Sequence, residues 1–384
     1  MNALPLEGLT VVSIEQAVAA PFATRQLADL GARVIKIERD AGDFARGYDT
    51  KVNGLASYFV WLNRSKESVV LDLKDPEDLA IAQDLIADAD VFVQNLAPGA
   101  GEKLGLGADA LLAKNPRLIH VSISGYGRGG PMEQKKAYDL LIQCESGLLS
   151  VTGSPDQVAK VGISIADVAS GMYAYTGVLT ALIQRGRTGR GDVIEISMLE
   201  ALGEWMQQPE LYARYSGSPP PRTGASHASI SPYGPFAAAD GTVFLGIQNE
   251  REWARFCADV LEQPELASHA SFSNNSLRTQ HVAELRDRIE SVFATLTVAE
   301  VLARLDAAAI ANAELRTMLG LGTHPQLAAR DRWVEVETTA GPIRVQRPPV
   351  TSREQGLRLG PVPALGAHTE QVKAEVRARR AEAG

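Results

Sequence analysis

The chain has 384 residues, of which 45% are hydrophobic and 22% are charged, a composition typical of folded proteins that excludes a disordered chain. At a typical domain length of ~150 residues, it is long enough for two or three domains, or for one large domain with an appendage. The 38 basic and 46 acidic residues leave a formal net charge of −8, which excludes a generally basic nucleic-acid binder but allows a local basic pocket for one anion.

The amino terminus and the cysteines predict a cytoplasmic protein. The first residues, MNALPLEGLTVVSIEQ, contain no basic segment followed by a long apolar run, so we expect no signal peptide. No stretch reaches ~18 uninterrupted apolar residues, so we expect no contact with a membrane. Cys144 and Cys257 belong to no CxxC pair or Cys/His cluster. We expect both to be reduced and to serve packing; a disulfide or a reactive thiol is the alternative.

Short β-branched runs alternate with helix-like segments in the first third of the chain. Two of the predicted helices are Pro21–Leu30 and Glu77–Ala87. Continuous apolar strands that alternate with amphipathic helices indicate an α/β fold, in which a mostly parallel sheet is covered on both faces. The predicted strands are Leu9–Ile14, Arg33–Ile37, Val69–Leu73, Val91–Gln94 and Leu118–Ser124.

The middle of the chain changes character. Val168–Ile183 predicts a long apolar helix that is buried or lies at a subunit interface. The segment RGRTGRGD then predicts a turn-rich hairpin, followed by a strand in VIEISML and a helix near Leu199–Tyr215. The Pro-, Gly- and Ser-rich stretch that begins at residue 216 is typical of a linker, which we place at 216–224.

The last third predicts a smaller domain at 225–325 and a tail. FAAADGTVFLGIQ is typical of a small hairpin, and helices are expected at Glu250–Leu261 and Val282–Leu296. The tail contains two strand-like segments, VEVET and IRVQ, before loops and a charged terminal helix.

Two common catalytic patterns lack their context. Gly125, Gly127 and Gly130 fit GxGxxG after a predicted strand, but a proline and a polar run follow instead of a clear helix. The first βα turn, IEQAVAAP, contains no glycine. A dinucleotide site needs glycines that open a helix, so we expect a flexible glycine loop here. There is no GxSxG, and the six histidines are scattered without metal-binding spacing, which argues against a serine hydrolase and a metal site.

Basic residues follow the predicted strands. Arg39 follows VIKIE and Lys74 follows LDL, and the last of these strands is followed by Arg128, Lys135 and Lys136. Ligands of open parallel sheets bind beyond the carboxyl ends of the strands. These cations therefore bind a polyphosphate such as coenzyme A (CoA) or a nucleotide, or they are solvated surface charges.

Asp167 is the remaining carboxylate of interest, in VGISIADVASGMYAYTG. With Ser164 it matches Ser-x-x-Asp, which predicts a capping box at the start of a helix. A catalytic role is the alternative.

Seven segments together resemble the class III CoA-transferases, the family of formyl-CoA and carnitine CoA-transferases, over nearly the full length. Each segment alone is weakly specific, but their order and spacing are highly specific. In chain order they are GLTVVSIEQAVAAPFATRQLADLGARVIKIER, NRSKESVVLDLKDPED, VFVQNLAPGAGEKLGL, SGYGRGGP, KKAYDLLIQCESGLLSVTG, ISIADVASGMYA and SPYGPFAAADG.

The resemblance implies roles for particular residues. Asp167 stands at the position of the family's nucleophile, which replaces the capping-box interpretation. Lys103 stands where relatives often have arginine; it neutralises a phosphate as a point charge rather than as a bidentate fork. Contacts with CoA are implied for Ala17, Val18, Arg39, Leu71, Asp72, Leu73, Lys74, Asn95, Leu96, Ala97, Lys136, Ala137 and Tyr138.

The resemblance also implies the architecture and the assembly. A Rossmann-like large domain is expected from 1–215 and 330–384, with a small α+β domain between these parts. Two chains are expected to form a homodimer of interlocked rings. The substrates are an acyl-CoA donor and a carboxylic acid acceptor, and no cofactor is expected to be bound permanently.

The implied mechanism uses a carboxylate to keep the acyl group activated. Attack by Asp167 on the thioester gives a mixed anhydride and a bound CoA thiolate, and an aspartyl-CoA thioester then mediates exchange with the acceptor acid. Backbone N–H groups near Asp167 or in a glycine loop are expected to stabilise the oxyanions. Water must be excluded, because it would hydrolyse the anhydride.

Departures from the family narrow the substrate. Formyl-CoA transferases that act on oxalate carry consecutive glycines in the small domain, whereas this chain has LGIQNEREW, which disfavours oxalate. Gln248 and Asn249 either donate hydrogen bonds to a polar acid or are exposed loop residues. We expect C4–C5 dicarboxylates such as succinate, mesaconate, itaconate and citramalate. Transfer of CoA between the C1 and C4 carboxyls of mesaconyl-CoA, within one molecule, is an alternative.

Two further functions are alternatives to CoA transfer. An α-methylacyl-CoA racemase needs a His/Asp base pair, but this chain has Tyr138–Asp139 there, and tyrosine is a poor base at neutral pH. A non-catalytic acyl-CoA-binding protein is the other, and an intact Asp167 argues against it.

Overall fold

A computed structural model describes residues 4–383 and divides the chain into two compact units. The first unit extends to Leu148 and continues through Val161–Gln208 and from Ala329 onward. The second comprises Leu149–Lys160 and Pro209–Ala328.

This division differs from the expected boundaries, because 149–160 and most of helix α10 (Gln207–Ser216) fall in the second unit. Hydrogen bonds tie 149–160 to the expected linker. The guanidinium of Arg222 donates to the carbonyls of Ser154 at 2.9 Å and Pro155 at 2.7 Å, and the Gly224 N–H donates to the Gly153 carbonyl.

The first unit is built on a six-stranded sheet with the order β3-β2-β1-β4-β5-β6, in which every neighbouring pair is parallel. The predicted parallel α/β sheet is therefore confirmed. The third strand begins earlier than predicted, at Lys66. The prediction missed this start because the first residues of the strand are charged. The strands are β1 (Thr10–Ile14), β2 (Arg33–Glu38), β3 (Lys66–Val70), β4 (Val91–Gln94), β5 (Ile119–Ser124) and β6 (Asp192–Ser197).

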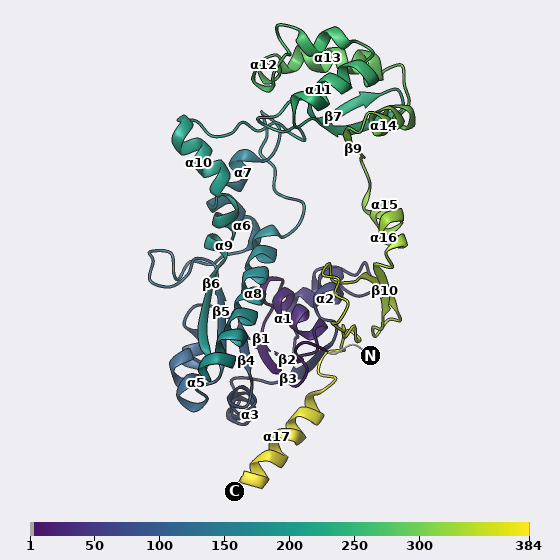
Figure 1. Cartoon of the computed structure of the whole chain (residues 1–384). Helices are drawn as coiled ribbons and strands as arrows, with labels where there is room; N and C mark the ends of the chain where they lie inside the picture. The colour runs from purple at the N-terminus through teal and green to yellow at the C-terminus, as the bar shows by residue number, and fades with distance from the viewer. Residues whose placement is uncertain (1–3, 384) are drawn as a thin grey trace. The chain divides into compact units, whose positions relative to one another are not determined.

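Helices cover both faces of this sheet (Figure 1). Because side chains alternate along a strand, Val11 packs into one core and Val12 into the other. The first core includes residues of α1 (Ala19–Asp29), α6 (Asp139–Glu145), α8 (Ile165–Thr188) and α9 (Met198–Trp205). The second includes residues of α3 (Pro76–Ala87), α5 (Ala108–Lys114) and α17 (Thr369–Ala383).

The long apolar helix is confirmed as α8, but the hairpin predicted from RGRTGRGD is wrong. The helix continues to Thr188 and ends at Gly189, whose φ of 72° is the left-handed conformation of a helix C-terminus. The chain then enters β6 beside β5. Gly191 permits this close approach, since a Cβ there would lie 1.9 Å from the Leu118 carbonyl oxygen.

Shorter elements complete the first unit. The two strands predicted in the tail are confirmed, and they pair as an antiparallel hairpin that packs with α2 in a small core. These elements are the 3₁₀ turn η1 (Phe44–Gly47), α2 (Ser57–Leu62), α4 (Ala100–Lys103), β10 (Trp333–Val336) and β11 (Ile343–Gln346), with α7 (Leu148–Val151) and α16 (Pro325–Ala329) at its boundaries.

The second unit has its own apolar core around an antiparallel sheet of order β7-β8-β9. The predicted hairpin is confirmed, and the helix expected at Glu250–Leu261 is α11 followed by a π-helical turn. The elements are β7 (Tyr233–Ala238), β8 (Gly241–Gly246), α11 (Glu250–Arg255), η2 (Phe256–Val260), η3 (Pro264–Ser268), α12 (Asn275–Gln280), α13 (Val282–Phe293), α14 (Val298–Ala307), β9 (Ala311–Glu314) and α15 (Met318–Gly322).

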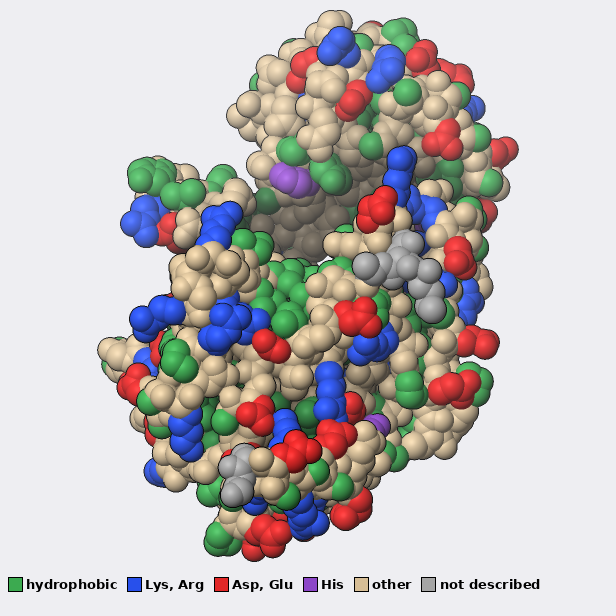
Figure 2. All heavy atoms as spheres, turned by 60° about the horizontal axis from the view of Figure 1, so that its bottom comes forward, with side chains coloured by type: hydrophobic (Ala, Val, Ile, Leu, Met, Phe, Trp, Pro, Cys, Tyr) green, Lys and Arg blue, Asp and Glu red, His purple; other side chains and the backbone are tan. Residues whose placement is uncertain are grey.

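Acidic and basic side chains are interspersed on the face that Figure 2 shows. Among the described residues, no helix combines the length and the apolar character needed to cross a membrane. A site for an anionic ligand must therefore be sought in a local arrangement of cations.

Candidate active site

A pocket of about 490 Å³ lies at the carboxyl ends of β1, β2 and β4. In the observed strand order, the chain reverses direction across the sheet between β1 and β4, which is where open α/β sheets bind ligands. The volume is that of a small-molecule site. The pocket brings together seven residues predicted to contact CoA: Arg39, Leu71, Asp72, Leu73, Lys74, Leu96 and Lys103.

The cations of this pocket are unpaired, unlike two of the other cations that follow the strands. Within residues 4–383, Arg39, Lys74 and Lys103 form no ion pair; Arg39 donates instead to the Gly42 carbonyl at 3.1 Å. By contrast, Arg128 binds Glu102 and Lys135 binds Glu145, both at 2.5 Å. The first three therefore suit an anionic ligand, and the last two are surface ion pairs.

The turn between β1 and α1 forms one edge of the pocket through Gln16. Asn95 holds this residue on both sides: its Oδ1 accepts from the Gln16 N–H at 3.0 Å, and its Nδ2 donates to the Gln16 carbonyl at 2.9 Å. Ala17 follows with a φ of 63°, and Val18 is the buried residue that precedes α1. Asn95 therefore orients the turn with its side-chain amide.

Asp167 lies in the first turn of α8 and is half-buried. Burial, and then the negative charge of Asp139, raise the pKa of its carboxyl to about 7. The expected capping box is wrong, because the Ser164 hydroxyl makes no cap hydrogen bond and instead lies 3.2 Å from the Tyr58 hydroxyl. Asp139 caps the helix in its place: its Oδ1 accepts from the N–H groups of Ala166 at 2.8 Å and Asp167 at 3.4 Å.

This capping affects two earlier expectations. The N–H groups of Ala166 and Asp167 already donate to Asp139, so they are not free to stabilise an oxyanion in this structure. The other oxygen of Asp139 accepts from the Gln143 side chain at 2.7 Å. Asp139 is therefore fully engaged as a structural acceptor, and Tyr138 beside it is 67% exposed. This arrangement does not favour a racemase base pair.

Tyrosines that the sequence analysis did not single out lie near Asp167. Burial, and then the charges of Asp43 and Asp167, raise the pKa of Tyr48 to about 12. Its ring contacts that of Tyr58 edge to face, with 5.6 Å between centroids. Because Asp43 lines the pocket and Asp167 heads α8, Tyr48 is within electrostatic reach of both. Tyr48 follows η1 and Tyr58 lies in the short helix α2, and neither belongs to a sequence motif that would have indicated its role.

The other predicted CoA contacts lie elsewhere in the first unit. Ala97 lines a separate small pocket at the ends of β4 and β5. Lys136 is exposed, and Ala137 packs so closely on the glycine loop that a Cβ at Gly125 would lie 2.2 Å from its own. No helix begins between Ser124 and Asp139, as the sequence predicted for this loop.

Gln248 and Asn249 are exposed residues of the second unit. The Asn249 Oδ1 accepts from the Glu252 N–H at 3.0 Å and caps α11, so its oxygen has a structural role. The Gln248 N–H donates to the Glu252 carboxylate at 2.8 Å. A contact between either side chain and a substrate stays a prediction.

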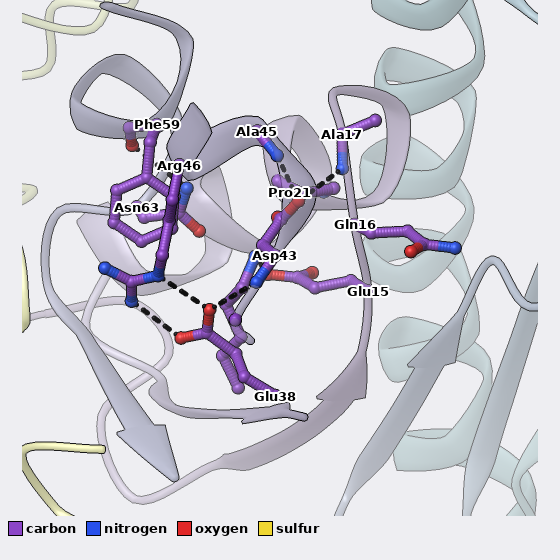
Figure 3. Close-up of polar contacts among 12 residues, drawn as sticks. Glu15, Gln16, Ala17, Pro21, Glu38, Asp43, Ala45, Arg46, Phe59 and Asn63 are labelled. Atoms are coloured by element: carbon purple, nitrogen blue, oxygen red, sulfur yellow. Dashed lines mark hydrogen bonds and ion pairs between the residues drawn. The ribbon is translucent and has the colours of Figure 1, made fainter. Parts of the chain in front are cut away.

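Six charged residues form a buried ionic network beside the turn of Gln16 and Ala17, and Figure 3 labels four of them: Glu15, Glu38, Asp43 and Arg46. Three carboxylates face three cations: Lys66 binds Glu15 at 2.7 Å, Lys36 binds Asp43 at 2.7 Å, and Arg46 binds Glu38 at 2.7 Å. The network thus consists of Glu15, Lys36, Glu38, Asp43, Arg46 and Lys66. Sequence reasoning missed it by treating RVIKIE as an apolar strand, although Lys36 and Glu38, two residues apart, point to the same face.

The pKa values within the network reflect both burial and pairing. Burial raises the pKa of Glu38, but hydrogen bonds from Arg46 and the charge of Lys36 outweigh it and bring the value to about 2. Burial also opposes ionisation of Glu15, whose pKa is nevertheless lowered by Lys66 and Lys36. Burial lowers the pKa of Lys66 to about 8 against the attraction of Glu15. The carboxylates of Glu15 and Glu38 are therefore ionised at neutral pH.

Comparison with known proteins identifies the family. The profile of CoA-transferase family III matches residues 6–369. Succinyl-CoA:glutarate CoA-transferase of Mus musculus is 34% identical, covering 97% of this chain and 86% of its own length. Succinyl-CoA–D-citramalate CoA-transferase of Chloroflexus aurantiacus is 31% identical, covering 96% of this chain and 93% of its own length.

The fold agrees with this. The crystal structure of a CAIB/BAIF family protein from Brucella suis superposes with a TM-score of 0.87 at 31% identity, covering 98% of this chain and all of that one. The chain therefore belongs to CoA-transferase family III and is an enzyme that transfers CoA.

Proposed function

We propose that this enzyme transfers CoA between small dicarboxylic acids, with Asp167 as the covalent nucleophile. The observation that carries the proposal is the half-buried carboxylate of Asp167 in the first turn of α8, in the same unit as the cation-bearing pocket. The named relatives act on succinyl-CoA with glutarate or D-citramalate. The C4–C5 dicarboxylates expected from the sequence belong to the same class of acid.

The chemistry follows from the carboxylate. An Asp167 oxygen attacks the thioester carbon, the C–S bond breaks, and CoA leaves as a thiolate that remains bound. The thiolate attacks the Asp167 carbonyl of the anhydride, giving the aspartyl-CoA thioester and the free donor acid. The acceptor acid then attacks this thioester to form a second anhydride and thiolate. Attack by that thiolate on the acceptor acyl carbon yields the new acyl-CoA and restores Asp167.

The three cations of the pocket suit the phosphates of CoA. Arg39, Lys74 and Lys103 extend from three segments at the carboxyl end of the sheet, and none has an ionic partner in the described chain. Apolar residues of the same pocket, such as Leu71 and Leu96, suit the adenine ring. We therefore assign the CoA moiety to this pocket.

We also propose a homodimer, with the interlocked rings implied by the family resemblance. In the first unit, the edge strand β6 exposes Val193 at 40%, and helix α8 exposes Ile183 at 63%. An apolar sheet edge of this kind is typical of a surface covered by another chain. Sedimentation at micromolar concentration tests this proposal, and a monomer would contradict it.

The function is tested by incubating the enzyme with succinyl-CoA and a panel of acids: glutarate, mesaconate, itaconate, citramalate and oxalate. Mass spectrometry of the CoA esters identifies the acceptors. Mesaconyl-CoA without an added acid tests transfer within one molecule. Hydroxylamine trapping during turnover is expected to label Asp167.

The matched variant is Asp167→Asn, which keeps the side-chain shape but cannot form the anhydride. Its turnover is expected to fall at least ~10³-fold while CoA affinity is retained. Because a half-buried charge is removed, its unfolding free energy at neutral pH should not fall. Turnover close to the wild-type rate would rule out the covalent mechanism.

A further inference from the structure

The turn between β1 and α1 contains a residue in an unfavourable backbone conformation. Ala17 has a φ of 63°, a left-handed conformation that residues with a Cβ rarely adopt. Such a conformation persists only where the surroundings impose it. The contacts of the turn therefore reveal what holds it.

Asp43 supplies the contact on the Ala17 side of the turn (Figure 3). Its Oδ1 accepts from the Ala17 N–H at 3.1 Å and also from the Ala45 N–H at 2.9 Å, the latter as the cap of η1. Its Oδ2 is bound by the Lys36 ammonium at 2.7 Å, and both side chains are fully buried. Its own N–H donates to Glu38 at 2.9 Å. Both oxygens of the Asp43 carboxylate are therefore held by hydrogen bonds or an ion pair.

Asn95 holds the other side of the turn through the Gln16 backbone, so the N–H groups of both Gln16 and Ala17 are occupied. A ligand can therefore contact the surface of the turn and the Gln16 side chain, but not the N–H groups of Gln16 and Ala17. Figure 3 places that side chain on the side away from Asp43, directed toward the ribbon of α8, the helix that carries Asp167. Gln16 and Asp43 both line the large pocket.

We propose that Asp43 is a positioning residue for CoA transfer: its hydrogen bond to the Ala17 N–H holds the Gln16–Ala17 turn in the conformation that seats the thioester against Asp167. This inference rests on the proposed function. The buried ionic network supports it by holding the Asp43 carboxylate in place through Lys36. Misplacement of a reacting group by about 1 Å is enough to cost on the order of 10²-fold in rate.

The test compares two double variants that lack the same two charges. In Lys36→Met/Asp43→Asn, the amide oxygen still accepts from both Ala17 and Ala45. In Lys36→Met/Asp43→Ser, the hydroxyl still caps η1 at Ala45, since serine is a good N-cap residue, but it is too short to reach Ala17. Neither variant leaves a buried Lys36 without its carboxylate, so both are designed to fold.

Three quantities are measured on the full-length enzyme: hydrogen exchange of the Ala17 amide, thermal unfolding, and kcat and KM for CoA transfer from succinyl-CoA to glutarate. We expect the serine variant to lose protection at Ala17 and to have a kcat about 10²-fold below that of the asparagine variant. We expect the two to unfold within a few degrees of each other, and the KM for succinyl-CoA to differ less than kcat.

Two outcomes would overturn the proposal. If the Ala17 amide stays protected in the serine variant, Asp43 does not hold the turn. If protection is lost but the two kcat values agree within about threefold, the turn does not position the thioester. If the wild-type enzyme moves no CoA between these substrates, the proposed function fails instead, and the exchange comparison still decides whether Asp43 fixes the turn.

Discussion

Two sets of charged side chains adjoin the same pocket and differ in whether they are paired. Each member of the buried ionic network has an opposite charge within 2.7 Å, whereas Arg39, Lys74 and Lys103 have no ionic partner among residues 4–383. The buried charges fix the backbone at the ends of β1 and β2. The three cations keep their charge available for a ligand. Removal of a buried charge should therefore affect stability first, and removal of a pocket cation should affect CoA binding alone.

The largest effect on stability is expected when one member of the buried ionic network is removed. Lys36→Met leaves the Asp43 carboxylate buried without a cation, which is expected to lower the unfolding free energy by about 3–5 kcal/mol. Lys36→Met/Asp43→Asn should lose clearly less, because no charge is left unpaired. Urea unfolding measures both, with Lys114→Met at an exposed site of α5 as the control. An equal loss in the single and double variants would show that pairing does not stabilise this region.

Much of the fold could be predicted because it depends on apolar runs that are continuous in the sequence. Val91–Gln94 is observed with its predicted bounds, and α8 was recognised from one uninterrupted apolar segment. The network could not be predicted in this way. The burial of Lys36 can be explained only when its partners Asp43 and Glu15 are known. Asp43 lies in a turn, and Glu15 directly follows the neighbouring strand β1.

The candidate site shows the same limit. Ser164 and Asp167 fit a local capping pattern, but the acceptor that caps α8 is Asp139, which lies 27 residues before Ala166 in the chain. A distant side chain replaced the local one, and no local pattern predicts this. The CoA pocket was easier, since Arg39 and Lys74 follow strands whose carboxyl ends meet at one edge of the sheet.

A second prediction concerns the pH dependence of catalysis. Only the ionised Asp167 attacks a thioester, and its pKa is raised to about 7 by burial and by Asp139. The kcat/KM for succinyl-CoA should therefore fall roughly tenfold for each pH unit below about 7 and level off above it. Asp139→Asn removes the neighbouring charge but leaves an oxygen to cap α8, so the break in the profile should move to lower pH.

The pH profile is measured with saturating glutarate. An unchanged break in Asp139→Asn would mean that burial alone sets the pKa of Asp167. A flat profile between pH 5 and 8 would contradict attack by a carboxylate that titrates at about 7.

The pocket cations provide the third prediction. Lys74→Ala and Lys103→Ala are each expected to weaken CoA binding about tenfold, or ~1.4 kcal/mol, with no loss of unfolding free energy. The effect should shrink as salt is raised, because both side chains are exposed. Calorimetric titration with CoA measures this, and Lys114→Ala serves as the control. Unchanged affinity in both variants would place the phosphates of CoA outside this pocket.

The smallest expected effect tests a buried group that belongs to neither set. His120 on β5 is 1% exposed, packs edge to face on Phe92, and has no hydrogen-bonding partner for either ring nitrogen among the described residues. Burial lowers its pKa against a smaller opposing effect of the Leu106 backbone, and the nearby charges of Arg128 and Glu102 act in opposite directions. Below the pKa of histidine in the unfolded chain, about 6.5, the unfolded chain therefore binds a proton at His120 that the folded chain does not bind.

The contribution of His120 to the unfolding free energy should accordingly fall as the pH drops below about 6.5, by at most ~1.4 kcal/mol per pH unit. His120→Leu fills the same apolar site without a titrating group, so the wild type should lose stability relative to this variant as the pH falls from 7 to 5, whatever other groups such as Asp167 contribute to both. Urea unfolding of the wild type and the variant at both ends of that range measures the difference. Parallel pH profiles would mean that the folded protein accommodates the protonated imidazole, and that a charge can enter this core without an acidic partner.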